Sequence, residues 1–239
     1  MTEFYHDADR NLLIYKTPSP LYADNVAHAI PEAKRFNGVW VAVPRTLQNA
    51  QTLRWLGYPV LPLITDTNYE WPAAKGMRPW ETQKLASNFM VAHPRCFNLS
   101  DMGVGKTLAA LWAADWLMRE YDRNKKRCAY CGPGMRTGLP GNACENCMNT
   151  GYDNPEDKMR ALIVAPLSIL QRVWADAIFR NFLSRRSLEI LHGDADRRVE
   201  KLARPADFYI VNHDGVGVGA HTRKRFDLDG FSKALAARH

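Results

Sequence analysis

The chain has 239 residues, of which 46% are hydrophobic and 24% are charged. This length suffices for one large domain and a small one, and the composition excludes an intrinsically disordered protein. No apolar run approaches the roughly 20 residues of a bilayer span, and residues 1–10 lack the apolar core of a secretory signal. We therefore expect a cytoplasmic or nucleoid-associated protein with no membrane partner.

The charge balance favours a polyanionic partner. Thirty-two Lys and Arg residues stand against 25 Asp and Glu residues, which gives a net charge of +7. Such a surplus attracts nucleic acid, although many basic proteins bind none. The net charge by itself therefore makes DNA a candidate partner but does not establish that DNA binds.

The N-terminal residues 1–72 are predicted to form a small α+β domain, followed by a junction rich in Pro, Gly and Ala over 71–80. Alternating apolar residues predict strands, and helical spacing predicts helices. The expected strands cover 11–17 and 38–44, and the expected helices cover 24–36, interrupted at Pro31, and 46–57.

From residue 76 to 239 strands and helices alternate, which is typical of an α/β domain with a parallel sheet flanked by helices. The expected strands are 96–101, 161–166, 187–192 and 207–212, and the expected helices are 81–93, 106–121, 167–182 and 194–203. An insert at about 123–158, rich in Gly, Asn, Cys and charged residues, interrupts this alternation.

Residues 99–107, "LSDMGVGKT", follow the phosphate-binding pattern G-x-x-x-x-G-K-[ST], with Ser100 at the first glycine position. Glycines allow the tight turn that brings backbone N–H groups against phosphate, and the following helix points its positive end at the anion. Lys106 would reach the β and γ phosphates of ATP, and the Thr107 hydroxyl would bind Mg²⁺. The expected nucleotide-contacting residues are Asp101, Met102, Gly103, Val104, Gly105, Lys106 and Thr107. The alternative is a glycine turn between a strand and a helix that binds no ligand.

The segment 100–107 resembles motif I of superfamily-two helicases, and especially of Swi/Snf-type DNA translocases. Further resembling segments follow the family's order: 78–83 for the adenine-recognition motif, 162–174 for motif Ia, 191–202 for the segment after it, and 207–216 for motif Ib. The resemblance implies a RecA-like first motor lobe that binds ATP, with Gln83 as the reader of adenine. This interpretation depends on the glycine turn lying between a strand and a helix.

The N-terminal domain has its own, weaker resemblance. Residues 30–57 are similar to the HepA-related domain that precedes the motor in annealing helicases. The alternative is an unrelated α+β cap.

The motor resemblance also implies a DNA-facing surface. Pro166, Leu167 and Ser168 of motif Ia and Asn212 and His213 of motif Ib would hold the backbone of duplex or single-stranded DNA, independently of sequence. Ser168 could equally cap a helix N-terminus.

One part of a motor is missing. Such enzymes hold Mg²⁺ and the attacking water with an Asp-Glu pair, and no Asp-Glu dipeptide occurs in the 239 residues. We expect the chain to be the N-terminal part of a longer motor, completed by a second lobe or a protein partner, and to hydrolyse ATP poorly alone. One alternative is an inactive remnant that serves as a DNA- or protein-binding module. Another is a different P-loop ATPase in which Asp214 holds the magnesium.

Four of the five cysteines form two C-x-x-C pairs, Cys128 with Cys131 and Cys144 with Cys147, separated by residues 132–143. Two such pairs supply the four thiolates of a closed, structural zinc site. The glycine-rich insert cannot fold by burial, so metal binding would supply the free energy. The alternatives are four reduced thiols or a redox pair, and Cys96 is expected to be buried.

Basic residues crowd this insert and could contact DNA phosphates, although a solvated surface explains them as well. They are Arg119, Arg123, Lys125, Lys126, Arg127 and Arg136.

We predict that the purified protein contains one zinc ion per chain, because four thiolates at this spacing complete a tetrahedral site. Metal analysis of the wild type and of Cys128→Ser tests this, with Cys96→Ser as the matched control that keeps its zinc. Zinc-free wild type, or an unchanged zinc content in Cys128→Ser, contradicts the prediction.

Overall fold

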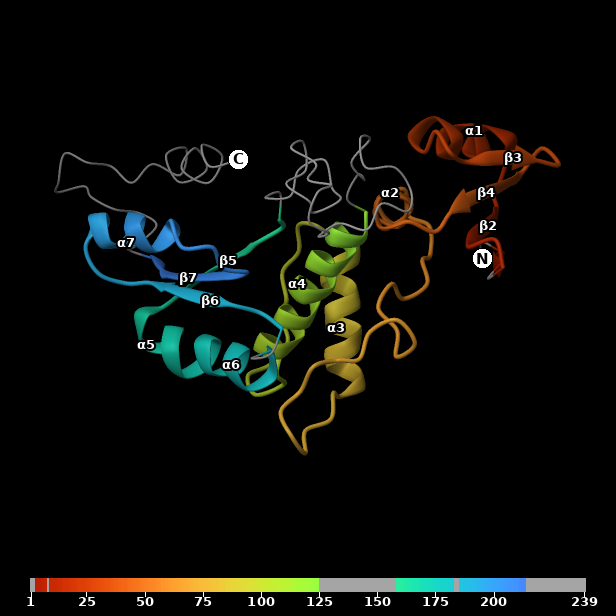
Figure 1. Cartoon of the computed structure of the whole chain (residues 1–239). Coiled ribbons are helices and arrows are strands. Elements are labelled where there is room, and N and C mark those ends of the chain that lie inside the picture. The colour runs from red at the N-terminus through yellow and green to blue at the C-terminus, as the bar shows by residue number, and fades with distance from the viewer. Residues whose placement is uncertain (1–2, 8, 125–157, 183–184, 214–239) are drawn as a thin grey trace, which may run out of the picture. The chain divides into compact units, whose positions relative to one another are not determined.

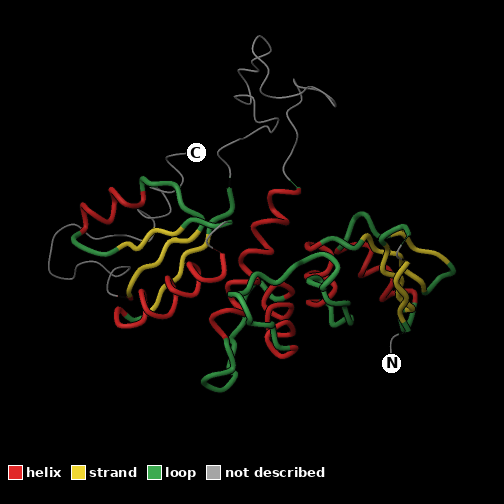
Figure 2. The backbone as a smooth tube through the Cα atoms, turned by 60° about the horizontal axis from the view of Figure 1, so that its bottom comes forward, coloured by secondary structure: helices red, strands yellow, loops and turns green. Residues whose placement is uncertain are grey.

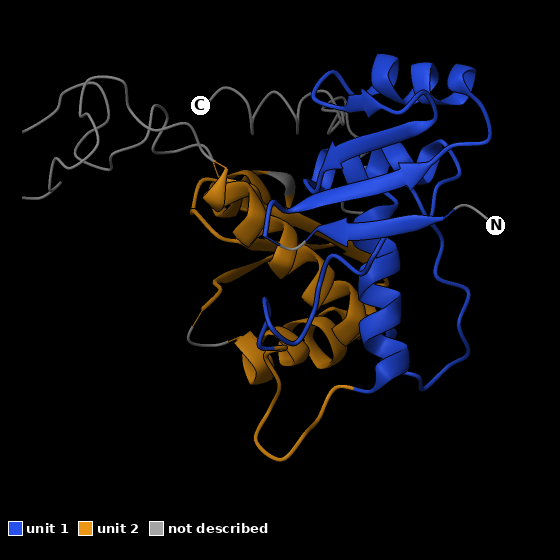
Figure 3. Ribbon diagram, turned by 90° about the vertical axis from the view of Figure 1, so that its right-hand side faces the viewer, with its two compact units in different colours: residues 1–70, 80–106 blue, residues 71–79, 107–239 orange. Residues whose placement is uncertain are grey.

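The structure is a computed structural model that describes residues 3–7, 9–124, 158–182 and 185–213 (Figure 1). Its contacts divide the chain into two units (Figure 3): unit 1 holds residues 1–70 and 80–106, and unit 2 holds residues 71–79 and 107–239. This division places residues 80–106 with the N-terminal part of the chain. The domain boundaries 1–72 and 76–239 stay a prediction.

Unit 1 contains an antiparallel sheet of four strands in the order β1-β2-β4-β3. The strands are β1 (Phe4–Asp7), β2 (Leu12–Lys16), β3 (Lys34–Phe36) and β4 (Trp40–Pro44), and the helices are α1 (Pro20–Ala29), α2 (Leu47–Trp55) and α3 (Glu81–Ala92). The two predicted strands and the helix over 46–57 are confirmed. The helix predicted over 24–36 ends at Ala29, before Pro31, and its last three residues form β3 instead. The polar β1 was not predicted.

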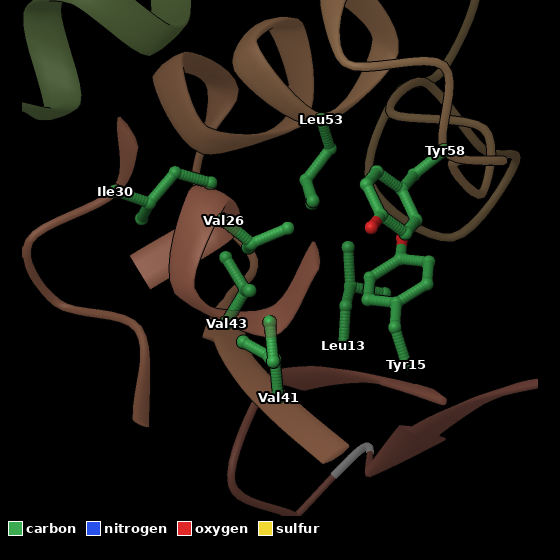
Figure 4. Packing of buried hydrophobic residues seen from close by; sticks show 9 residues of the cluster. Leu13, Tyr15, Val26, Ile30, Val41, Val43, Leu53 and Tyr58 are labelled. Atoms are coloured by element: carbon green, nitrogen blue, oxygen red, sulfur yellow. The ribbon is translucent and has the colours of Figure 1, made fainter. Parts of the chain in front are cut away.

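One face of this sheet forms the core of unit 1 (Figure 4). Leu13 and Tyr15 of β2 alternate with exposed or half-buried neighbours, as do Val41 and Val43 of β4, so all four side chains point to the same face. Helices α1 and α2 cover that face with further apolar side chains, among them Val26 of α1 and Leu53 of α2.

Unit 2 contains a parallel sheet of three strands in the order β5-β7-β6, which confirms the predicted parallel sheet in part. The strands are β5 (Ala161–Ala165), β6 (Leu188–Leu191) and β7 (Phe208–Asn212). β7 lies between the other two, and its first four residues are buried, which explains its continuous apolar sequence.

The helices of unit 2 are α4 (Lys106–Arg123), α5 (Leu167–Ile169), α6 (Asp176–Phe182) and α7 (Ala195–Leu202), with a π-helical segment at Leu170–Ala175. α6 and α7 lie on opposite faces of the sheet (Figures 1 and 2). The connection from β5 to β6 passes across β7 to the far edge of the sheet. The connection from β6 to β7 then runs back in the opposite direction. Right-handed crossovers in opposite directions place their helices on opposite faces.

A buried acid ties α4 to the strands of unit 2. The Asp115 side chain is buried and accepts a hydrogen bond of 2.6 Å from Arg186 Nε. Arg119 Nε lies 3.5 Å from the same carboxylate, and Arg186 also contacts Asp207 at 3.4 Å. Burial lowers the pKa of Arg186, but the hydrogen bond and charge of Asp115 outweigh this and hold the pKa above its ordinary value. Such pairing offsets the desolvation cost that an unpaired buried carboxylate would carry.

The strand predicted over 96–101 is wrong, because these residues form no strand. Asn98 Oδ1 accepts hydrogen bonds from the backbone N–H and the hydroxyl of Ser100, at 3.2 and 2.6 Å. Local bonds of this kind satisfy the backbone in a turn rather than in a ladder. Phe97 and Leu99 are 87% and 90% exposed, and Cys96, which was expected to be buried, is exposed as well.

In the described ranges, no helix combines the length and the apolar character that crossing a membrane would require.

We predict that Tyr15→Phe changes the pH dependence of stability. The Tyr15 hydroxyl is buried and donates a hydrogen bond of 2.7 Å to Pro59 O. Burial raises its pKa from 10.0 to about 12, although the charge of Arg54 opposes this. The unfolded state therefore loses this proton at a lower pH than the folded state, so the wild type loses stability as the pH rises above 10, by about 2.3 kcal/mol at pH 12 and at most about 2.7 kcal/mol at higher pH.

At pH 8 the variant should be about 1 kcal/mol less stable, because the hydrogen bond is lost. Urea midpoints at increasing pH should show this gap closing and then reversing. Tyr5→Phe, on an exposed tyrosine, is the matched control and should follow the wild type. A gap that is constant with pH contradicts the prediction.

Candidate functional site

The glycine loop leads directly into the N-terminus of α4. Gly103 and Gly105 have φ angles of 85° and 76°, in the left-handed region that glycine adopts without strain. α4 begins at Lys106 and runs for 18 residues. The N–H groups of its first turn have no acceptors within the helix, and the helix dipole adds positive potential there. This junction therefore has the geometry that binds anions.

Lys106 folds back over the loop that precedes it. Its Nζ donates hydrogen bonds of 2.5 Å to Ser100 O and 3.0 Å to Asp101 O. The ammonium group thus closes a ring formed by residues 100–106. An ammonium group has three N–H donors, so one is left for a ligand.

Gln83 reaches the loop from the first turn of α3. Its Oε1 accepts a hydrogen bond of 3.0 Å from the Trp80 N–H, which caps that helix. Its Nε2 lies against Gly105, where a Cβ would stand only 1.9 Å from it. The structure therefore brings together two residues that the sequence assigned to one site. A side chain at position 105 would be strained by the φ of 76° and would require the Gln83 amide to move.

The other predicted loop residues differ in exposure. Asp101 and Met102 are exposed, and Val104 and Thr107 are half-buried. The role of Thr107 as a magnesium ligand stays a prediction. Among the described residues no three His, Cys, Asp or Glu side chains form a group that could hold a metal ion. Asp214, the alternative magnesium ligand, lies outside the described residues, as do Cys128, Cys131, Cys144 and Cys147.

The predicted DNA-facing residues gather at one edge of the parallel sheet. In the register of β5 and β7, Ala165 pairs with Asn212. Pro166 and His213 each follow the end of these neighbouring strands, and both are exposed. This is the carboxyl edge, where open α/β sheets bind ligands.

Ser168 is exposed in α5, next to this edge, but it does not cap that helix. Pro166 is the N-cap residue, so the alternative role of Ser168 as an N-cap is wrong.

His192 is a residue of this edge that the sequence did not single out. It follows β6, whose Leu191 pairs with Val211, and it is exposed. Gly193 follows with a φ of 115°. The "HGD" turn after a predicted strand was the available signal, because a glycine there marks a sharp exit from the strand.

Two of the basic residues proposed for DNA contact are paired with carboxylates. Arg119 lies near Asp115, and Arg123 NH1 lies 3.4 Å from Glu120 Oε2. The remaining four lie outside the described residues.

No protein-family model matches the chain, and no curated protein matches it in sequence.

Proposed function

We propose that residues 100–107 bind the phosphates of ATP with Mg²⁺, in the first RecA-like lobe of a Swi/Snf-type DNA translocase that carries a zinc-binding insert. The observation that carries the proposal is the loop itself. Two glycines with positive φ and the ammonium group of Lys106 surround the N-terminus of an 18-residue helix.

The order of the motifs supports the assignment to a motor, and the sheet of unit 2 is compatible with it. β5, β6 and β7 are parallel, and Pro166 and His213, which belong to the segments that resemble motifs Ia and Ib, follow the carboxyl ends of β5 and β7. The motor interpretation required the glycine turn to lie between a strand and a helix, and residues 96–101 form no strand, so that condition is not met and the motor assignment rests on the order of the motifs alone. Phosphate binding needs only the turn and the helix, so it is the firmer part of the proposal.

Catalysis by this chain alone should be slow. The sequence contains no Asp-Glu pair to hold Mg²⁺ and orient water. Binding is therefore the property to measure first.

We predict that Lys106→Ala weakens the binding of a fluorescent ATP analogue, with Mg²⁺, by about tenfold or more. A hydrogen bond to a charged group contributes about 1.5–3 kcal/mol, and tenfold corresponds to about 1.4 kcal/mol. Lys75→Ala removes an exposed lysine and is the matched control, which should bind as the wild type does. Equal affinities in the two variants, or no binding by the wild type, would remove the proposal.

A second candidate function, a module that binds single-stranded DNA, is favoured by the outer face of the unit 1 sheet. The Trp40 ring lies 5.7 Å from the Tyr5 ring and 6.1 Å from the Phe36 ring. Lys16 Nζ lies 5.9 Å from the Trp40 ring, and the register places Lys34 beside Ala42 on the same face. Two exposed aromatic rings and the half-buried Trp40, with cations nearby, form a surface on which bases can stack.

This face lies opposite the core of unit 1. The register pairs Tyr5 with Ile14, Ile14 with Ala42, and Trp40 with Phe36, so these residues alternate with the buried positions of β2 and β4. Tyr5 is 57% exposed. Tyr5 and Phe36 are therefore exposed on this face, and Trp40 is half-buried beside them.

We predict that Trp40→Ala weakens binding of a fluorescent single-stranded oligothymidine by about fivefold or more, because one stacked base contributes about 1–3 kcal/mol. Trp55→Ala is the matched control, since Trp55 is exposed on α2, away from this face. Fluorescence anisotropy at low salt measures both. If Trp40→Ala binds as tightly as Trp55→Ala, this face is not the binding surface.

A further inference from the structure

We propose that single-stranded DNA on the outer face of the unit 1 sheet lies on the β3 side of Trp40, with Lys34 as its phosphate contact, and that Glu3 withholds Lys16 from the same role. This inference rests on the second candidate function above and names the residues that set the affinity of that surface. The two lysines lie on one face and differ in what holds them.

The strand register places both lysines on this face. Lys16 of β2 lies opposite Trp40, and Lys34 of β3 lies opposite Ala42. Directly opposed residues of an antiparallel pair point to the same face, and so do residues two apart along one strand. Trp40 and Ala42 are two apart in β4, so the two lysines flank β4 from either side.

Lys16 is held by a carboxylate. Its Nζ donates hydrogen bonds of 3.2 and 3.4 Å to the two carboxylate oxygens of Glu3. The Lys16 N–H also donates to Glu3 O at 2.9 Å, so the two residues lie opposite each other just before β1 begins. A phosphate that approached Lys16 would meet the negative charge of Glu3 at the same ammonium group. This carboxylate therefore competes with DNA for Lys16.

Lys34 is exposed and has no competing acid. In the part of the chain that the structure describes, no carboxylate forms an ion pair with it. Its neighbour Arg35 pairs with Asp24 of α1 and lies opposite the buried Val41, so that arginine belongs to the other face of the sheet. Lys34 is therefore the cation of β3 that a phosphate on the outer face can reach.

An aromatic ring accompanies Lys34 on the same strand. Phe36 lies two residues along β3, roughly 7 Å away along the strand, and points to the same face. It is exposed, and its ring stacks beside Trp40 at 6.1 Å and 16°. β3 thus offers a ring for a base and a cation for the adjoining phosphate, the two contacts that hold a single strand without reading its sequence.

The test is fluorescence anisotropy of a labelled oligothymidine with the full chain, over a series of salt concentrations. Lys34→Ala should weaken binding at low salt and lower the slope of log affinity against log salt by about 0.7, the contribution of one phosphate contact on a single strand. Lys16→Ala removes the other lysine of the face and is the matched control, which should keep the wild-type slope. An equal fall of the slope in both variants, or none in Lys34→Ala, overturns the inference.

The role of Glu3 has its own test. Glu3→Gln keeps the size of the side chain and removes its charge, so Lys16 becomes available. This variant should bind more tightly than the wild type and steepen the slope by about 0.7. The steepening should be absent when Lys16→Ala is added, because the released cation is then gone. A steepening that persists without Lys16, or none in Glu3→Gln, contradicts the competition.

Trp40→Ala separates this inference from the function on which it rests. If Trp40→Ala weakens binding but Lys34→Ala and Lys16→Ala behave alike, the surface binds DNA and only the assignment of the lysines is overturned. If Trp40→Ala binds as the wild type does, the second candidate function is overturned and this inference with it.

Discussion

The contact between the Gln83 amide and Gly105 is the constraint that positions the glycine loop of residues 100–106. It joins the capped first turn of α3 to the residue that precedes Lys106. Lys106 then closes the loop from the other side through two backbone carbonyls. A loop held at both points keeps its N–H groups in position before any ligand arrives, and preorganisation of this kind lowers the cost of binding.

The two sheets present different surfaces because their strands run differently. The antiparallel sheet of unit 1 buries one face, and its other face carries the exposed Tyr5 and Phe36 and the half-buried Trp40. The parallel sheet of unit 2 has helices on both faces, so its polar residues collect at the carboxyl edge. Each candidate surface thus follows from the direction of the strands that carry it.

Much of the fold could be predicted from the sequence. Alternation in β2 and β4, continuous apolar residues in β7, and the helical spacing of α4 identified these elements within a few residues of their observed bounds. Predictions from local sequence patterns were wrong at two places, the strand expected over 96–101 and the end of the helix expected over 24–36. Asn98 binds Ser100 and replaces the expected strand, and Pro31 lets the chain after α1 turn into β3.

The sequence by itself determined which residues could form the phosphate loop, because the spacing of Gly103, Gly105, Lys106 and Thr107 is a local property of the chain. Only the tertiary structure decided that the Gln83 amide packs against Gly105, since this contact depends on how α3 packs beside a loop that is more than 20 residues away. It also decided that Asp115 pairs with Arg186, because nothing in the helical pattern of α4 marks a buried acid or names its distant partner. Contacts between residues distant in sequence are set by packing, which no local pattern records.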